Sequence, residues 1–76
     1  MKELVELIAR ALVNEPSAVA VSEIDGENGS VLQLTVAPGD LGKVIGRQGR
    51  TARSLRTIVA AAGVKARRRI VLDIVE

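Results

Sequence analysis

The chain has 76 residues, carries a net charge of +2 and contains no Cys, His, Phe, Tyr or Trp. This length suits one small domain, and the missing residues exclude a disulfide framework, thiol or imidazole catalysis, and nucleobase stacking on aromatic rings. No apolar run approaches the roughly 20 residues that span a bilayer, so we expect residues 1–76 to form one cytoplasmic domain without membrane contact, cofactor or metal.

The charges are divided unevenly along the chain. Nine basic residues and no acidic residue lie between Lys43 and Arg69, whereas residues 1–42 carry two basic and seven acidic residues. A basic half of this kind attracts polyanions and steers them to one face. Nucleic acid is therefore the expected class of ligand.

An amphipathic helix is predicted over Met1–Asn14. The helix is followed by Pro16, which pushes the preceding residue out of the helical region. Its apolar residues recur at three- and four-residue spacing, with charged residues elsewhere on the wheel. The stripe consists of Leu4, Ile8, Ala11 and Leu12.

A β-hairpin is predicted next. Ala18–Ile24 is short and rich in small and β-branched residues, and Val31–Ala37 alternates apolar with polar residues. The segment between them, Asp25–Ser30, holds two glycines and is expected to form the hairpin loop.

Two helices and a third strand complete the chain. A short helix is expected over Leu41–Ile45, N-capped by Asp40. A longer helix follows Gly49 and is expected to end at Gly63 as its C′ residue, before a strand over Ile70–Val75. The apolar stripe of the longer helix consists of Ala52, Leu55, Ile58, Val59 and Ala62.

These elements define an α+β fold with the order α-β-β-α-α-β. A helical crossover should make Val31–Ala37 and Ile70–Val75 parallel neighbours, while the hairpin keeps Ala18–Ile24 antiparallel on the other side. The expected result is a three-stranded mixed sheet with three helices packed on one face. Val71 and Val75 should then lie on a thinly covered face.

The turn Gly46-Arg47-Gln48-Gly49 lies between the two later helices, inside the acid-free basic stretch. Glycines let the backbone approach a ligand closely, and the amides at the start of the following helix favour an anion. Arg47 and Gln48 can donate to phosphate or sugar oxygens. The turn is therefore expected to hold a nucleic-acid backbone.

With this turn in this order of elements, the chain resembles a type II KH domain, the bacterial arrangement of that RNA-binding module. The string from Asp40 to Thr51 and the short length resemble the KhpA family of small stand-alone bacterial KH proteins. The resemblance covers nearly the whole chain. A glycine pair at this spacing is weak evidence alone, but its position between the helices makes it specific.

The resemblance implies that the turn clamps about four nucleotides of single-stranded RNA. The bases would lie between the later helices and the first strand with its Asp25–Ser30 loop, over a floor of Ile45 and Ala52. Val21 is a further floor candidate that the motif does not place. The expected RNA-binding residues are Lys43, Ile45, Gly46, Arg47, Gln48, Gly49, Arg50, Thr51 and Arg53.

Two departures from the family pattern favour low sequence specificity. Ala52 stands where a bulky aliphatic residue is common, and Asp25 and Glu27 in the hairpin loop would repel a phosphate. We therefore expect an RNA chaperone or post-transcriptional regulator that binds RNA with little base preference.

Purely structural roles remain open for the same residues. The two glycines can simply let two helices pack at a sharp angle, and Arg50, Arg53 and Arg56 can form a solvated helix face. The run from Arg67 to Arg69 can block edge-to-edge sheet pairing instead of contacting RNA.

Catalysis is the least favoured function, because the spacing of a nucleotide-binding P-loop and a suitably placed carboxylate pair are both missing. The alternative to RNA binding is a protein-interaction module. The resemblance implies a homodimer, or a heterodimer with a second RNA-binding protein of the KhpB/Jag type. The surfaces expected for such contacts are Val59, Ala60 and Ala61 on the longer helix, and Val71 and Val75 on the sheet.

Overall fold

A computed structural model describes residues 1–76 and has the predicted order of helices and strands, joined by three short 3-10 turns. The helix Leu41–Ile45 has the predicted bounds, whereas the other elements differ from prediction at their ends. The elements are α1 (Lys2–Leu12), β1 (Ala20–Asp25), β2 (Gly29–Thr35), α2 (Leu41–Ile45), α3 (Arg50–Lys65) and β3 (Arg69–Ile74).

The three strands form a mixed sheet in the order β1-β2-β3. β1 pairs antiparallel with β2, with Val21 opposite Leu34, and β2 pairs parallel with β3, with Leu32 beside Leu72. Both pairings are as predicted, because a tight hairpin forces an antiparallel pair and a helical crossover permits a parallel one.

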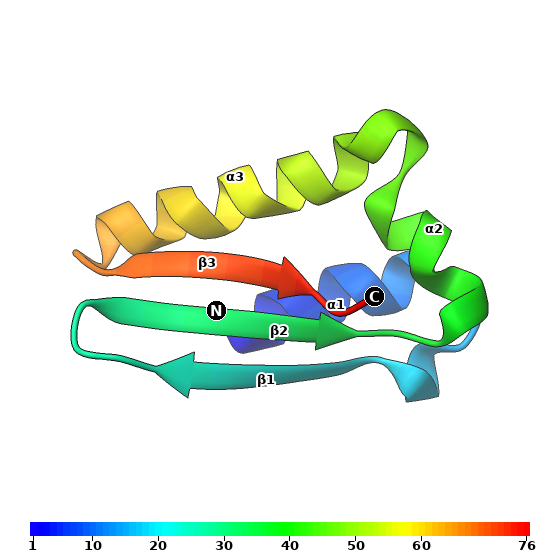
Figure 1. Ribbon diagram of the computed structural model, residues 1–76, viewed down its shortest axis with the longest axis horizontal. Helices are drawn as coiled ribbons and strands as arrows, with labels where there is room; N and C mark the ends of the chain where they lie inside the picture. Colours follow the sequence, from blue (N-terminus) through cyan, green and yellow to red (C-terminus); the bar gives the residue numbers. More distant parts are fainter.

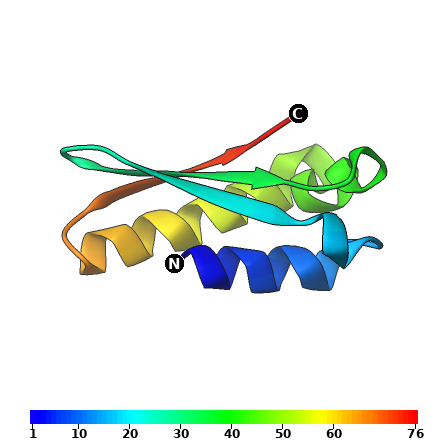
Figure 2. The ribbon, with the colours of Figure 1, turned by 90° about the horizontal axis from the view of Figure 1, so that it is seen from below.

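The helices lie on one face of this sheet. α1 and α3 run beneath the strands, and α2 lies at the end of this layer, in contact with both (Figures 1 and 2). The opposite face is uncovered: Val71 and Val75 are 45% and 44% exposed there, as predicted. The core lies between the sheet and the helices and includes Val5, Ala9, Val21, Leu32, Leu34, Val44, Ala52, Leu55, Val59, Leu72 and Ile74.

The buried stripe of α1 differs from the predicted one. Val5 and Ala9 are 1% exposed and face the sheet, whereas Leu4 and Leu12 are 40% and 39% exposed. Most of this helix surface is apolar, so its pattern allows more than one stripe. Of the other predicted residues, Ile8 is half-buried and packs against the core, and Ala11 is exposed.

The hairpin loop is shorter than predicted, because β1 extends to Asp25 and β2 begins at Gly29. The amide of Gly26 donates to the carbonyl of Gly29 at 2.7 Å and closes the turn. A Cβ at Gly29 would collide with the backbone carbonyl of Arg69 in β3. Glycine is required here by close packing of neighbouring strands.

The end of α3 is also different from the prediction, since the helix continues through Gly63 to Lys65. Gly63 is buried within it, and the amide of Arg68 donates to the Gly63 carbonyl at 2.7 Å while Arg67 donates to Val64 at 3.0 Å. This pair of bonds is a Schellman motif, whose left-handed C′ residue is Arg67 at φ 59°. Within the predicted apolar stripe, Ile58 is 45% exposed.

Candidate nucleic-acid interface

The turn between α2 and α3 has three residues with positive φ. Gly46, Gln48 and Gly49 lie at 77°, 57° and 73°, and only Gln48 has a side chain in this unfavourable region. The Gly46 amide donates to the Gly42 carbonyl at 2.8 Å, and the Gly49 amide to the Gly46 carbonyl at 3.1 Å. The turn is therefore a hydrogen-bonded structure of defined shape.

The two glycines of the turn have different surroundings. A Cβ on Gly46 would lie 2.7 Å from the Thr51 Cβ, so this position is closed by the protein itself. A Cβ on Gly49 would meet nothing within 4 Å. The close approach of Thr51 explains why position 46 is glycine, whereas the Cβ side of Gly49 faces open space.

The start of α3 has no side-chain cap. The first amides of a helix lack intrahelical partners and carry the positive end of the helix dipole. In α3 the Arg50 amide donates to the Arg47 carbonyl in the turn, so the available donors are amides later in the first turn. Nearby, Arg50 donates to the Gln48 Oε1 at 3.1 Å. The exposed end of this helix thus combines backbone donors with positive charge.

The nine predicted binding residues lie together at this end of the molecule, from the second half of α2 to the first turn of α3. Arg47, Arg50 and Arg53 are exposed and form no ion pair with an acidic residue. Lys43 differs, since its Nζ lies 3.4 Å from the Asp40 Oδ1. The half-buried members are Ile45, Gly46, Gly49 and Thr51, and Gln48 is exposed.

Asp40 does not N-cap α2, contrary to the prediction. Its buried carboxylate instead accepts hydrogen bonds from the amides of Glu15 at 2.9 Å and Asn14 at 3.2 Å, beyond the end of α1. Burial raises the pKa of this carboxyl, but the two amides and the Lys43 ammonium outweigh it and hold the pKa below its ordinary value. Asp40 therefore ties α1 to the segment that carries the turn.

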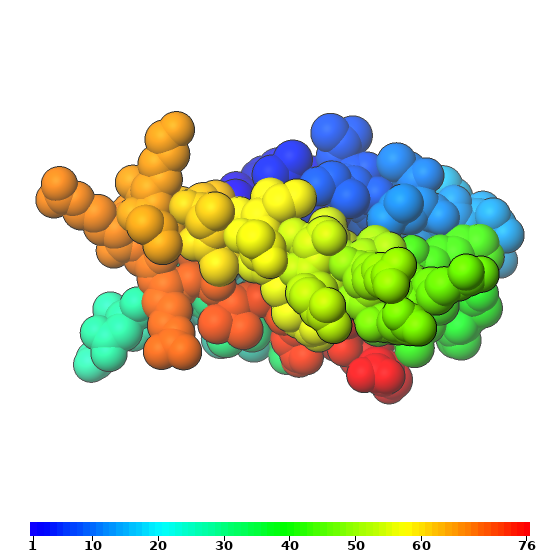
Figure 3. Space-filling model, turned by 90° about the horizontal axis from the view of Figure 1, so that it is seen from above, coloured from blue at the N-terminus to red at the C-terminus, as the bar shows by residue number.

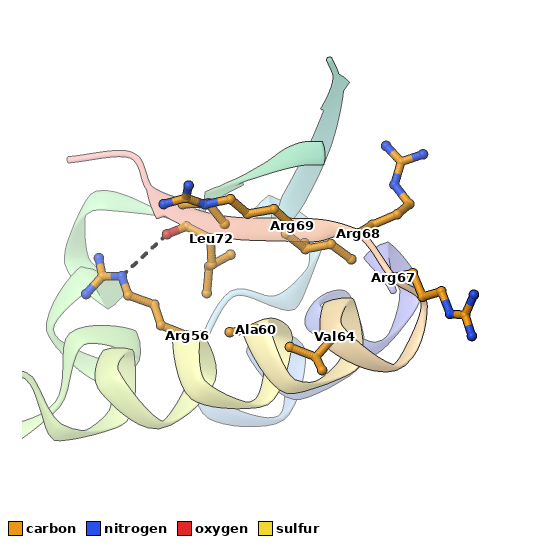
Figure 4. A pocket seen from close by; sticks show the side chains of 9 residues that line it. Arg56, Ala60, Val64, Arg67, Arg68, Arg69 and Leu72 are labelled. Atoms are coloured by element: carbon orange, nitrogen blue, oxygen red, sulfur yellow. Dashed lines mark hydrogen bonds between the residues drawn. The ribbon is translucent and has the colours of Figure 1, made fainter. Parts of the chain in front are cut away.

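A groove of about 520 Å³ runs along the second half of α3, on the side of β3 (Figure 4). The prediction that β1 forms a wall of the groove is wrong. β1 is the edge strand on the other side of β2 from β3, and it does not border this groove. The predicted floor residues Ala52 and Val21 are 2% and 6% exposed and belong to the core. The lining residues are Arg56, Ala60, Val64, Arg67, Arg68, Arg69, Ile70, Val71 and Leu72.

The helical wall of this groove was not predicted, and it consists of Arg56, Ala60 and Val64. Residues four apart share a helix face, so their spacing marks a second face beside the buried one. The Nε of Arg56 donates to the Leu72 carbonyl at 3.4 Å, across the groove (Figure 4). Only the position of β3 shows that this face adjoins a strand edge.

Arg68 pairs with Asp25, one of the two hairpin carboxylates that were expected to repel phosphate. Its guanidinium lies 3.4 Å from the Asp25 Oδ1 and donates to the Ser30 hydroxyl at 2.8 Å. Ser30 in turn donates to Asp25 at 2.6 Å. In Figure 4 this arginine points away from α3.

A glycine turn between two helices, inside an α-β-β-α-α-β fold with a mixed sheet, is the arrangement of a type II KH domain. The family model described as KhpA/KhpB, KH domain matches residues 2–74. The chain belongs to this family, as the resemblance of its sequence to KhpA-type KH proteins predicted.

Three curated relatives, each called RNA-binding protein KhpA, match almost end to end. The protein of Halalkalibacterium halodurans is 54% identical over all of both chains. That of Aquifex aeolicus is 53% identical over 100% of this chain and 96% of its own. That of Clostridium acetobutylicum is 52% identical over 99% of this chain and all of its own.

No solved structure shows significant similarity to the chain.

None of the helices of this chain is long and apolar enough to cross a membrane.

Proposed function

We propose that the chain binds single-stranded RNA through the turn Gly46-Arg47-Gln48-Gly49. The observation that carries this proposal is the start of α3, which has no side-chain cap and lies beside a glycine with free space, within a surface whose exposed arginines lack acidic partners. The names of the relatives, all RNA-binding proteins, support the same ligand.

The turn acts on the RNA backbone. A phosphate beside Gly49 accepts from the first amides of α3, where the helix dipole favours negative charge. Arg47 and Arg50 add charge-assisted hydrogen bonds to phosphate oxygens, and Gln48 and Thr51 donate to sugar or phosphate. Gly46 shapes the turn by leaving room for Thr51, which fills the space that a side chain at this position would need.

The bases then lie along α3 on the side of β3. Ile45 provides an apolar contact near the turn, and Ala60, Val64 and Ile70 provide an aliphatic surface further along. Aliphatic contact with base faces distinguishes poorly between nucleotides. Phosphate contacts also carry no sequence information. We therefore propose a low-specificity RNA chaperone or post-transcriptional regulator acting in the cytoplasm, where such RNA is found.

The test is the double variant Arg47→Asp/Gln48→Asp. Both side chains are exposed, and Asp tolerates the left-handed backbone at position 48, so the melting temperature should stay near that of the wild type. Retention of an unstructured RNA in a filter-binding assay should fall at least tenfold. A folded variant that binds as tightly as the wild type would refute the clamp.

A matched control places the same charge change elsewhere. Lys2→Asp/Ser17→Asp also lowers the net charge by three, at exposed positions outside the proposed interface. It should reduce RNA affinity far less than the turn variant does. Equal losses in both variants would indicate a general field effect and not a clamp.

A second function, protein association, is favoured by exposed apolar side chains on the helical layer. Leu7 on α1 is 67% exposed, and Ile58 on α3 is 45% exposed. Val59, a surface candidate from the sequence, is buried and cannot contribute. We propose a homodimer, or a heterodimer with a protein of the KhpB/Jag type.

Sedimentation at micromolar concentration without RNA tests this association. A dimer that Ile58→Lys converts to monomer supports contact through the helical layer. A strict monomer in the wild type, both alone and with a KhpB-type protein, contradicts the proposal.

A further inference from the structure

Arg67 occupies a backbone conformation that favours glycine. At φ 59° it is the C′ residue of the Schellman motif that ends α3, a position where glycine is common because a Cβ is disfavoured. Its side chain makes no hydrogen bond or ion pair within the protein, and Figure 4 shows it projecting away from the helix and the sheet. Nothing in the fold requires arginine here.

The three consecutive arginines at this end have different partners. Arg68 is engaged by Asp25 and Ser30, as described above. Arg69 has no partner, and its side chain extends along β3 in the direction of Leu72 (Figure 4). Arg67 and Arg69 are therefore the two unengaged cations at this end of the groove, and both line it.

These cations lie at the opposite end of α3 from the glycine turn. Figure 3 shows side chains from the end of α3 and the start of β3, in orange, projecting into solvent at one end of the molecule, with the turn, in green, at the other. α3 has 16 residues, which corresponds to a separation of about 24 Å at 1.5 Å per residue.

We propose that Arg67 and Arg69 form a second phosphate-binding site, so that a bound RNA runs from the glycine turn along α3 to this end of the groove. The inference rests on the proposed RNA-binding function and extends it to the length of RNA recognised. At about 3.4 Å per stacked nucleotide, the 24 Å path holds about seven nucleotide steps, and fewer if the strand is unstacked. The turn alone holds about four nucleotides.

Oligouridylates of four, six, eight and ten nucleotides provide the probe, with affinity measured by fluorescence anisotropy at several salt concentrations. Wild-type affinity should rise from the four- to the eight-nucleotide RNA and change little beyond it. Arg67→Gly/Arg69→Gln should bind the tetramer like the wild type but lose at least fivefold for the octamer. The slope of log affinity against log salt for the octamer should weaken by about 0.7 for each lost phosphate contact.

Arg67→Gly alone separates binding from stability. Its melting temperature should equal or exceed that of the wild type, because glycine relieves the left-handed backbone, while octamer affinity falls. Lys65→Gln is the matched control: it removes one exposed positive charge two residues away, outside the groove, and should leave the length dependence unchanged.

The outcomes distinguish the two proposals. A wild type that binds no oligouridylate at any length refutes the proposed function itself. Wild-type binding that depends on Arg47 and Gln48, combined with unchanged octamer affinity in the Arg67/Arg69 variant, refutes only the second site. The second site is also refuted if the double variant loses as much affinity for the tetramer as for the octamer, or if Lys65→Gln loses as much octamer affinity as Arg67→Gly, because both results would reflect net charge alone.

Discussion

Gly63 provides a sharp test of how α3 is positioned on β3. A Cβ at this residue would lie 2.5 Å from the Arg68 carbonyl oxygen and 3.1 Å from the Ile70 amide nitrogen, whereas ordinary contact begins at 3.4 Å. Both atoms belong to the backbone, so no side chain can turn aside. Gly63→Ala must therefore separate the end of α3 from the start of β3 by up to about 0.9 Å.

Two opposing effects decide the size of the change. Overpacking of a tight site costs about 1–3 kcal/mol, and the upper part of that range applies because the contact is with backbone. Alanine recovers about 1 kcal/mol of helix propensity over glycine. We expect a net loss of about 1–2 kcal/mol, which lowers the melting temperature of a domain of this size by roughly 5–15 °C.

Thermal unfolding followed by circular dichroism measures this loss. Gly42→Ala in α2 is the control, because a Cβ there meets nothing within 4 Å, and it should be neutral or stabilising. Gly63→Asn distinguishes the packing explanation from a C′ role. Asparagine tolerates a left-handed C′ position, so a C′ role would leave stability nearly unchanged. Close packing predicts that Gly63→Asn destabilises the protein as Gly63→Ala does. A Gly63→Ala protein that melts above the wild type would refute the close approach.

Two further predictions concern the polar contacts that position the interface. Because the pKa of Asp40 is lowered on folding, its stabilising contribution is present above the unfolded value near 4 and is lost as pH falls through the folded value. Urea unfolding should show Asp40→Asn to be less stable than the wild type at pH 7, with the difference shrinking below about pH 4; a constant difference would contradict this. Arg68→Ala should cost about 0.5–1.5 kcal/mol through its lost bond to Ser30, yet leave tetranucleotide affinity within twofold. A large loss of affinity would mean that Arg68 itself contacts RNA.

The order of elements, the bounds of α2, the sheet topology and the turn could be predicted from the sequence, because each depends on neighbouring residues or on general rules of connection. Gly46–Gly49 lies between two helices whose apolar periodicity is local. The parallel pairing of β2 and β3 follows from a helical crossover. The family could be predicted as well, because the glycine turn and the order of elements together resemble those of its members.

Residues far apart in the sequence decided the rest. The carboxylate of Asp40 accepts from amides 25 and 26 residues away, a partnership that no local pattern contains, and it competes with the N-cap role that the sequence favoured. The buried face of α1, which includes Val5 and Ala9, was decided by packing against the sheet. The wall of the groove was set by which strand, β3 and not β1, lies beside α3, since contact across a fold depends on tertiary packing and not on sequence spacing.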